Sequence, residues 1–457
     1  MKNSPVLESE SLIALRTALD RLERGFESLP SQADRSVDSA AIEKVLLEAA
    51  ERLRDNYPYF HPLYAGQMLK PPHPVARMAY ALAMWVNPNN HALDGGRASS
   101  AMEKEAVAEI ASMFDWKEHL GHLTGGGTMA NLEALWVAGQ LHPEGTIVAC
   151  DQAHYTHSRI SNVLRLRFES IPCEGKGRID LHALEKRLAK GGVTTVVATI
   201  GTTASGSVDA LPEIFSLQNR YGFRVHADAA YGGYFGLIDN LSAETRRAFA
   251  SLRDVDSLVI DPHKHGLQPY GCGCVLFRDP SVGRFYKHDS PYTYFSSGDL
   301  HMGEISLECS RPGAAAVGLW ATQKLLPLRR GGEFAKMLGD SREAALALYE
   351  KLQKDRRFVT AFRPELDIVI WAARAPRVSE ASKISQALFE EAAKNQLHLA
   401  LAELPVEFFP LDSTQTKVDG KTITCLRSVL MKPEHRQWVD RIYDILSRAA
   451  DTVLKAR

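Results

Sequence analysis

The chain of 457 residues has few cysteines, almost no net charge and no long apolar run. Its six cysteines are irregularly spaced, and the one close pair, Cys272 and Cys274, lacks the second pair that a zinc site needs. The formal net charge of −1 gives no reason to expect nucleic acid or an anionic membrane as a partner. Apolar stretches such as 78–86 are too short to cross a bilayer, and the first residues lack the basic and apolar regions of a signal peptide. We therefore expect a cytoplasmic protein with reduced thiols and no bound metal.

The first 70 residues are expected to form a helical segment, because apolar residues recur at helical spacing in 12–24 and 42–53. A proline-rich stretch follows at 61–74, where missing N–H donors and fixed φ angles exclude a regular helix. Further along, Ser100 to Glu103 has the form of a capping box and predicts that a helix starts there.

Residues 71–325 are expected to form one large domain in which short apolar runs alternate with amphipathic stretches. Strands are predicted at 146–150, 195–199, 225–227 and 258–260, and helices at 130–140, 181–190, 211–221 and 243–252. Such alternation, with strands apolar on both faces, indicates an α/β domain with a mainly parallel sheet covered on both sides. Ligands of such sheets bind at the carboxyl ends of the strands.

The sequence changes in character near Leu326-Pro327, so residues 326–457 are expected to form a smaller α+β domain. Its predicted elements are a strand at 366–371, a helix at 382–395, a strand at 424–430 and a last helix from Glu434.

The stretch Asp261-Pro262-His263-Lys264 follows the predicted strand that ends at residue 260. A lysine at such a strand end is expected among apolar groups, which disfavour its charged form. An amine of this kind can form a Schiff base with an aldehyde, and pyridoxal 5′-phosphate is the obvious one. Taken alone, Lys264 is more simply interpreted as an ordinary surface lysine. The residues at the other strand ends therefore decide between this interpretation and a Schiff-base lysine.

A glycine run leads into a predicted helix, and a histidine follows a predicted strand. Gly125-Gly126-Gly127-Thr128 leads into a helix, where close backbone approach and free N–H groups favour a phosphate, with a flexible turn as the alternative. His154 comes after the strand at 146–150, and its imidazole is suited to lie flat on an aromatic cofactor ring. A hydrogen-bonded loop histidine and a metal pair with His157 are the alternatives, although no third ligand accompanies the pair.

Asp228 ends the predicted strand at 225–227, and small residues, Ala229 and Ala230, follow it. A buried carboxylate needs a partner, and a pyridinium nitrogen is one that Asp228 would keep protonated. The small residues leave room for a planar ring, whereas an aspartate that merely caps a turn is the alternative.

Taken in order, these motifs resemble those of the group II pyridoxal-phosphate-dependent amino-acid decarboxylases, the family that includes aromatic-amino-acid, glutamate and archaeal tyrosine/aspartate decarboxylases. The resemblance runs from about residue 60 to 330 and rests on Asp151-Gln152-Ala153-His154, Gly201-Thr202-Thr203, 226–233 and 261–264. It implies the aspartate-aminotransferase-type fold (fold type I). It also implies a homodimer with active sites shared between the subunits, in which residues 1–70 pack on the partner.

By position, the resemblance assigns Lys264 to the Schiff base with pyridoxal phosphate, Asp228 to the pyridine nitrogen and His154 to the ring face. The remaining cofactor contacts that it implies are Gly126, Gly127, Thr128, Thr203, Ala230, Asp261 and His263. Asp261 stands where relatives resembling the aromatic decarboxylases have asparagine, and an anion beside a phosphate is unfavourable. A turn cap is therefore the alternative role of Asp261.

The family's proton donor to Cα is a tyrosine on a mobile loop, which by position is Tyr292 here, with Tyr294 as the fallback. Relatives with phenylalanine at this place tend to make aldehydes, so the tyrosines favour an amine product. Substrate contacts are expected at Gln67, Met68, His91 and Arg311, the last as a bidentate carboxylate ligand. These residues permit an aromatic or an acidic (aspartate or glutamate) side chain, of which we favour the aromatic.

The expected reaction is decarboxylation of an L-amino acid to the amine and CO₂. An aminotransferase or aldehyde synthase of the same fold would keep Lys264 and Asp228 and differ in its product. A lyase or desulfurase would need a nucleophilic cysteine, for which Cys309 is the candidate. A protein that only binds the cofactor would turn over no amino acid.

Overall fold

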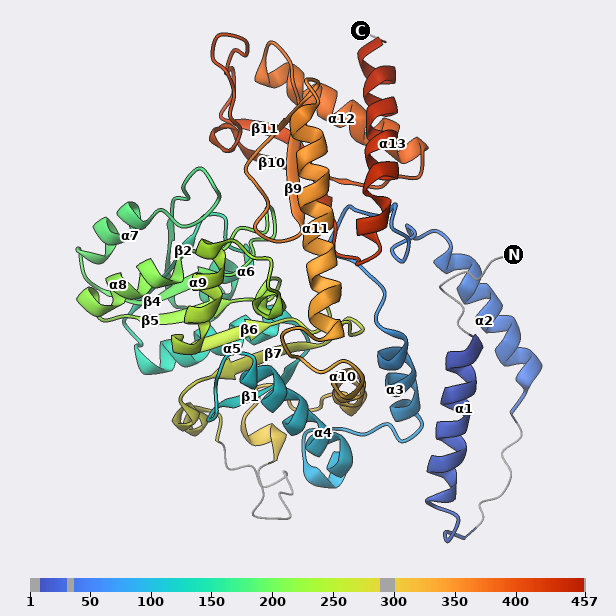
Figure 1. Cartoon of the computed structure of the whole chain (residues 1–457). Coiled ribbons are helices and arrows are strands. Elements are labelled where there is room, and N and C mark those ends of the chain that lie inside the picture. The colour runs from blue at the N-terminus through green and yellow to red at the C-terminus, as the bar shows by residue number, and fades with distance from the viewer. Residues whose placement is uncertain (1–8, 31–36, 288–300, 456–457) are drawn as a thin grey trace.

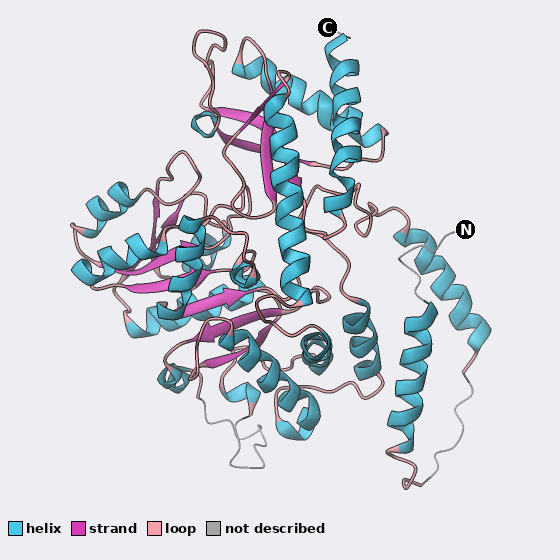
Figure 2. Ribbon diagram, in the orientation of Figure 1, coloured by secondary structure: helices cyan, strands magenta, loops and turns pink. Residues whose placement is uncertain are grey.

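The computed structural model describes residues 9–30, 37–287 and 301–455. Figure 1 shows two sheets with their helices, one above the other, and a helix pair beside them at the N-terminal end. Figure 2 separates the strands of the lower, larger unit from those of the upper, smaller one. The N-terminal pair is α1 (Ser9–Arg24) and α2 (Ser39–Leu53).

The larger unit contains the strands β1 (Leu120–Thr124), β2 (Thr146–Cys150), β3 (Arg167–Ile171), β4 (Val193–Thr199), β5 (Arg224–Asp228), β6 (Ser257–Ile260) and β7 (Gly273–Phe277). Its α-helices are α3 (Pro74–Met84), α4 (Leu93–Ser112), α5 (Gly127–Leu141), α6 (Thr156–Val163), α7 (Leu181–Leu188), α8 (Leu211–Tyr221), α9 (Ala243–Ala250) and α10 (Gly313–Leu325).

The sheet of the larger unit has the strand order β1-β7-β6-β5-β4-β2-β3. Strands β3, β2, β4, β5 and β6 pair in parallel, and β7 runs antiparallel to both β6 and β1. The predicted mainly parallel sheet is therefore confirmed. Since β1 and β6 are both antiparallel to β7, the carboxyl ends of β1, β2, β4, β5 and β6 lie at one edge, where ligands of such sheets bind.

Local sequence explains both the predicted elements and those that were missed. Helix α8 has Pro212 in its first turn and ends at Gly222, whose φ of 67° is left-handed. Strand β3 was missed because it is the edge strand and mostly exposed, so it carries no apolar run. Strand β1 was missed because Gly121 and His122 interrupt its apolar run, and the backbone at Gly121 packs closely against Leu276.

The predicted helix start at Ser100 is wrong. Helix α4 begins at Leu93 and continues through a kink at Gly96 (φ −165°, ψ 57°). Glu103 is buried and accepts hydrogen bonds from Asn90 Nδ2 (2.6 Å) and the backbone N of Leu123 (3.0 Å). Its carboxylate thus joins α4 to β1 instead of capping the helix.

The smaller unit has an antiparallel sheet of the order β10-β11-β9-β8. Its elements are α11 (Glu333–Lys354), β8 (Phe358–Thr360), β9 (Ile368–Ala373), α12 (Val378–Lys394), β10 (Ala400–Pro405), β11 (Thr422–Val429) and α13 (His435–Lys455). The largest apolar cluster includes Ile200 of the larger unit together with Leu338 and Ile368 of the smaller one. The two units therefore share a core, and the boundaries at 70/71 and 325/326 stay a prediction.

The N-terminal helices carry exposed apolar side chains. No residue of α2 is buried, and Val45, Leu46 and Leu47 are each more than 60% exposed. Helix α1 packs against α3 but leaves Leu12 and Ile13 exposed. Among the described residues, no helix has the length and hydropathy needed to span a membrane.

Candidate active site

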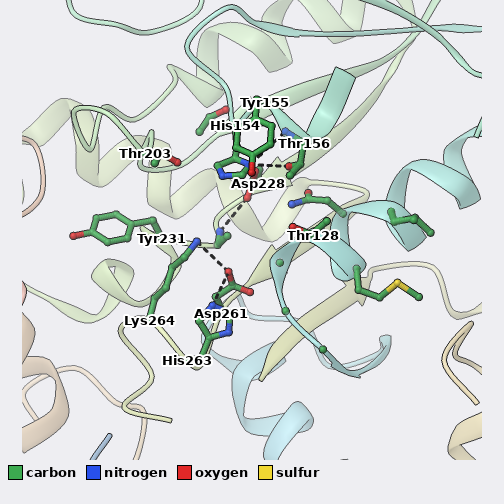
Figure 3. A pocket seen from close by; sticks show the side chains of 18 of the residues that line it. Thr128, His154, Tyr155, Thr156, Thr203, Asp228, Tyr231, Asp261, His263 and Lys264 are labelled. Carbon is green, nitrogen blue, oxygen red and sulfur yellow. Dashed lines mark hydrogen bonds and ion pairs between the residues drawn. The ribbon is translucent and has the colours of Figure 1, made fainter. Parts of the chain in front are cut away.

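A cavity of about 600 Å³ opens at the carboxyl ends of β4, β5 and β6, beside the N-terminus of α5. This volume is in the range of small-molecule sites. All ten residues that we expected to contact a cofactor line it, which are Gly126, Gly127, Thr128, His154, Thr203, Asp228, Ala230, Asp261, His263 and Lys264. Figure 3 shows the labelled members of this set around one opening. Their individual roles stay predictions, but the sheet edge brings them together.

Lys264 lies opposite a carboxylate. Its Nζ is 3.0 Å from Asp261 Oδ2 (Figure 3), so the apolar setting expected for this lysine is wrong. The backbone N of Lys264 donates to the carbonyl of Asp261 at 2.9 Å, which forms the turn. The Asp261 carboxylate contacts side chains of that turn, with Oδ2 3.5 Å from His263 Nε2, and its Oδ1 has no hydrogen-bond partner among the described residues. Asp261 therefore faces the cavity and Lys264, and it is not a turn cap.

The glycine loop brings the backbone close to the same carboxylate. A Cβ at Gly127 would lie 2.6 Å from Asp261 Oδ2, so no larger residue fits there. Gly126 has φ 145°, which glycine alone adopts readily. No side chain caps the N-terminus of α5. The first amides of the helix are therefore left to bind an anion, and the helix dipole favours one.

Asp228 ends β5 and is almost fully buried. Its Oδ1 accepts a hydrogen bond from the backbone N of Ala230 (3.2 Å), and its Oδ2 is 2.8 Å from His157 Nε2. Burial raises the pKa of this carboxyl. The hydrogen bond and charge of His157, and then the charges of Lys264 and His226, outweigh burial and hold the pKa of Asp228 well below its usual range.

His154 presents its ring to the cavity from the turn before α6. Its Nδ1 is 2.8 Å from Thr156 Oγ1, and the ring of Tyr155 packs on it at 4.5 Å between centroids and 30° between planes. Burial lowers the pKa of both His154 and His263. The two imidazoles are therefore largely neutral near pH 7.

Several lining residues were not predicted. Tyr155 and Tyr231 adjoin the motif residues His154 and Ala230, so their place in the motifs is the signal that could have found them. Glu308 carries no such signal, and it reaches the wall because its Oε2 accepts from the backbone N of Gly125 (2.9 Å). The other lining residues outside our list are Gly125, Met129, Asn131, Leu132, Thr156, Thr199 and Gly201.

The four predicted substrate residues do not line the cavity in this chain. Gln67 is exposed, and its Oε1 accepts from Arg427 Nη1 at 3.2 Å. Met68 packs against the main core, and its carbonyl accepts from Tyr270. His91 lies beside the thiol of Cys309, 3.7 Å from Nε2 to Sγ.

The structure corrects the expected position of Arg311. This side chain does bind a carboxylate, but that of Glu103, with Nη1 2.9 Å from Oε1. Nη1 also donates to the carbonyl of Leu123. Both Arg311 and Glu103 are buried, so this ion pair joins α4 to the segment before α10 and is not open to a substrate.

Arg427 on β11 is a buried cation that sequence reasoning missed. Its Nε and Nη2 have no hydrogen-bond partner among the described residues, and no carboxylate forms an ion pair with it there. It interacts electrostatically with Tyr231, which lines the cavity and donates to Asp367 Oδ1 at 2.6 Å. No motif marks Arg427, because it lies about 200 residues from the cavity residues of β5.

The predicted proton donors, Tyr292 and Tyr294, lie outside the described residues. Within the described ranges, no group of three or more His, Cys, Asp or Glu side chains forms a candidate metal site. The residues present fit pyridoxal phosphate. An amine, a buried carboxylate and a helix N-terminus without a side-chain cap line one cavity, and they match the aldehyde, the ring nitrogen and the phosphate.

Comparison with known proteins agrees with this fit. Residues 58–374 match the family described as "Pyridoxal-dependent decarboxylase conserved domain". The L-tyrosine decarboxylase of Enterococcus faecium is 26% identical over 453 residues, covering 75% of this chain and 74% of that protein. A probable L-tyrosine/L-aspartate decarboxylase of Methanosphaera stadtmanae is 28% identical over 310 residues, covering 66% and 77%. The solved structure of Oryza sativa TDC with PLP and tryptamine has a TM-score of 0.78 at 18% identity, over 99% of both chains, which confirms the expected fold.

Proposed function

The chain belongs to the pyridoxal-dependent decarboxylase family and is a pyridoxal-phosphate-dependent amino-acid decarboxylase, and from this premise we propose that its substrate is an aromatic L-amino acid. The product is then the corresponding amine, with CO₂. The rest of the proposal concerns which residues act and how the side chain of the substrate is chosen.

The charges of the cavity wall favour an aromatic substrate over an acidic one. Three carboxylates line it, those of Asp228, Asp261 and Glu308, whereas Lys264 is the one lysine and no arginine occurs among the described lining residues. Burial keeps the imidazoles of His154 and His263 largely neutral by lowering the pKa of each. An acidic side chain would therefore enter a wall without a free cation, which is unfavourable.

Apolar and aromatic groups complete the same wall. Met129, Leu132 and the ring of Tyr155 line the cavity, and Tyr155 is 67% exposed. An aromatic substrate side chain can pack on such groups with offset or edge-to-face geometry. Relatives whose names include L-tyrosine decarboxylase are in keeping with this choice.

Several groups of the site have a proposed task. Lys264 provides the amine that binds the cofactor aldehyde, Asp228 holds a proton at the ring nitrogen, and the first amides of α5 bind the phosphate. His154 lies against the ring face. When bound, pyridoxal phosphate supplies an electron sink that stabilises negative charge at the substrate Cα. Tyr292 is proposed to donate the proton to Cα.

Arg427 is proposed to bind the α-carboxylate of the substrate. It is buried, and two of its donor atoms, Nε and Nη2, have no partner among the described residues. These two atoms form the edge of a guanidinium that binds a carboxylate in bidentate fashion. Arg311 leaves the same two atoms without a partner, but its Nη1 is paired with the buried Glu103, so the role that we expected of Arg311 is proposed for Arg427.

We also propose a homodimer with shared sites, in which α1 and α2 pack on the partner subunit. The exposed apolar side chains of α1 and α2 (Leu12, Ile13, Val45, Leu46 and Leu47) support this assembly, because such surfaces are normally covered by a partner. Leu46→Asp should shift the mass measured by sedimentation towards the monomer. A cytoplasmic location is proposed as well, since all six cysteines are unpaired.

The test is a turnover assay of the purified chain with added pyridoxal phosphate. We expect CO₂ and amine from L-tyrosine, L-phenylalanine or L-tryptophan, and at least tenfold lower kcat/KM with L-aspartate and L-glutamate. Lys264→Ala is the control and should release no CO₂. Preferred turnover of an acidic substrate would overturn the aromatic assignment, and an α-keto acid product would overturn the reaction.

Product analysis of Tyr292→Phe tests the proposed proton donor. We expect this variant to divert product from the amine towards the aldehyde, measured by mass spectrometry. Tyr294→Phe is the matched variant on the same segment. If it alone diverts the product, Tyr294 is the donor.

A further inference from the structure

His157 lies one helical turn after His154, in the first turn of α6, but it faces another neighbour. His154 lines the cavity, whereas His157 is not among the lining residues and is 1% exposed. Its Nε2 is 2.8 Å from Asp228 Oδ2. The two histidines therefore have different places in the site. His154 lies at the surface of the cavity, and His157 lies behind it, against the Asp228 carboxylate.

The hydrogen bonds of Asp228 fix the plane of its carboxylate. Oδ1 accepts from the backbone N of Ala230, and Oδ2 accepts from His157. A carboxylate held at both oxygens has little freedom to rotate. Its orientation towards a ring nitrogen in the cavity is then set before any ligand binds, which reduces the cost of binding.

The hydrogen bond of His157 to Asp228 comes from Nε2, and Nδ1 has no hydrogen-bond partner among the described residues. Because the carboxylate oxygen accepts, Nε2 carries the N–H of this bond. His226 packs edge-on at 6.4 Å between centroids, and burial lowers the pKa of His226 to about 3. The other groups that act on this cluster are Arg224, on the same strand as His226, and Lys264 and His154, which line the cavity.

His226 is itself fixed from two sides. Its Nδ1 is 2.9 Å from Ser257 Oγ, and its Nε2 is 2.8 Å from Asn131 Oδ1. The ring that packs against His157 is therefore held between β6 and α5. This makes the position of His157, and with it that of the Asp228 carboxylate, a property of the folded sheet edge.

We propose that His157 is the positioning residue of Asp228, and that its Nε2–H keeps this carboxylate ionised and aimed at the ring nitrogen of the bound cofactor. The proposal rests on the proposed role of Asp228 and goes beyond it, since it assigns a task to a residue outside the cavity. Without this donor, the buried carboxylate of Asp228 takes up a proton more readily, because a hydrogen bond to the charged form is lost. The ring nitrogen would then be less fully protonated.

The experiment compares three variants with the wild-type chain, each loaded with pyridoxal phosphate labelled with ¹⁵N at the ring nitrogen. His157→Phe keeps a ring and removes the donor. His157→Gln carries an amide donor that reaches about as far as Nε2, and His157→Asn carries one that is too short. We expect the ¹⁵N shift of a protonated ring nitrogen in the wild-type and Gln forms, and a shift towards the unprotonated value in the Phe and Asn forms. The dissociation constant of the cofactor should rise about 10-fold or more in the last two.

A cofactor analogue with C–H in place of the ring nitrogen separates positioning from general distortion. Its affinity should be equal in wild type and His157→Phe, because it offers Asp228 nothing to hold. Equal weakening of both ligands in His157→Phe would overturn the proposal, as would a protonated nitrogen and unchanged affinity in the Phe and Asn forms. If His157→Phe does not fold, the Gln and Asn pair decides by the same two measurements. A wild-type chain that fails to bind pyridoxal phosphate would instead reject the proposed function.

Discussion

The cavity has two sides that differ in where their residues come from. The cofactor side is built from the ends of β4, β5 and β6 and the start of α5, and all of its expected members are present in one chain. The substrate side was expected from Gln67, Met68, His91 and Arg311, and none of these four residues lines the cavity. The cofactor side is therefore formed by one edge of the sheet. The substrate side instead depends on how segments that are distant in the sequence pack near that edge.

The charges of the two sides also differ. Asp228, Asp261 and Glu308 line the cavity itself, while Arg427 and Lys432, both buried, lie at the junction of the N-terminal segment with β11. On the proposed role of Arg427, the substrate carboxylate binds at this junction, where Asp367 acts on Arg427 and Glu434 acts on Lys432. Substitutions on each side test this division.

Removing the charge of Asp228 should cost the most activity. Asp228→Asn keeps the shape but cannot stabilise a proton on the ring nitrogen, so kcat should fall about 10²- to 10³-fold, measured as amine release. Asp151→Asn is the matched control, because Asp151 follows β2 but does not line the cavity. Equal losses in the two variants would show that position at the sheet edge, and not contact with the cofactor, determines the effect.

Sequence reasoning found the cofactor side because parallel strands place their ends together. Lys264, Asp228 and His154 each follow a short apolar run, so their convergence needed no knowledge of loops or of a second subunit. The same reasoning failed at Glu103, whose sequence resembles a capping box. Its carboxylate is taken by Arg311, 208 residues away, and no local pattern reveals such a partner.

The substrate side shows why the remainder could not be predicted. Arg427 lies on β11 of the smaller sheet and contacts Gln67 of the N-terminal stretch, so its place depends on the packing of two units. Helical spacing predicted α1 and α2, but their exposed apolar faces became visible only in the structure. His157 was considered only as half of a metal pair, since the sequence does not show that Asp228 lies within hydrogen-bond distance.

Arg311 should be a stability residue. Arg311→Met leaves Glu103 buried without its cation, so the free energy of unfolding should fall by about 3–5 kcal/mol, measured by urea denaturation at a fixed cofactor concentration. The double variant Arg311→Met with Glu103→Gln should recover part of this loss, because the unpaired charge is gone. A large rise in KM for the folded Arg311→Met protein would move Arg311 back to the substrate side.

Arg427 should instead determine substrate affinity. Arg427→Lys keeps the charge but loses the planar pair of donors, so KM for an aromatic amino acid should rise about 10-fold or more with a smaller change in kcat. Arg311→Lys is the control and should leave KM within a factor of about two. If the two variants exchange these results, the carboxylate site lies at the segment before α10 and the division drawn above is wrong.

Lys432 reports on the burial and the charges of the junction without any substrate. Burial, and then the charge of Lys70, lower the pKa of Lys432 to about 7, so the unfolded chain binds more protons than the folded one from about pH 7 up to its ordinary pKa. The free energy of unfolding should therefore rise with pH across this window, by up to about 1.4 kcal/mol per pH unit for one lysine. Lys432→Met should flatten that slope in urea denaturation between pH 7 and 9.5, whereas Lys354→Met, at an exposed position on α11, should not.

An unchanged slope in Lys432→Met would mean that Lys432 stays protonated in the folded chain, which requires an anion that compensates it. The junction would then hold a negative charge close to Lys432, which is unfavourable for a substrate carboxylate bound nearby.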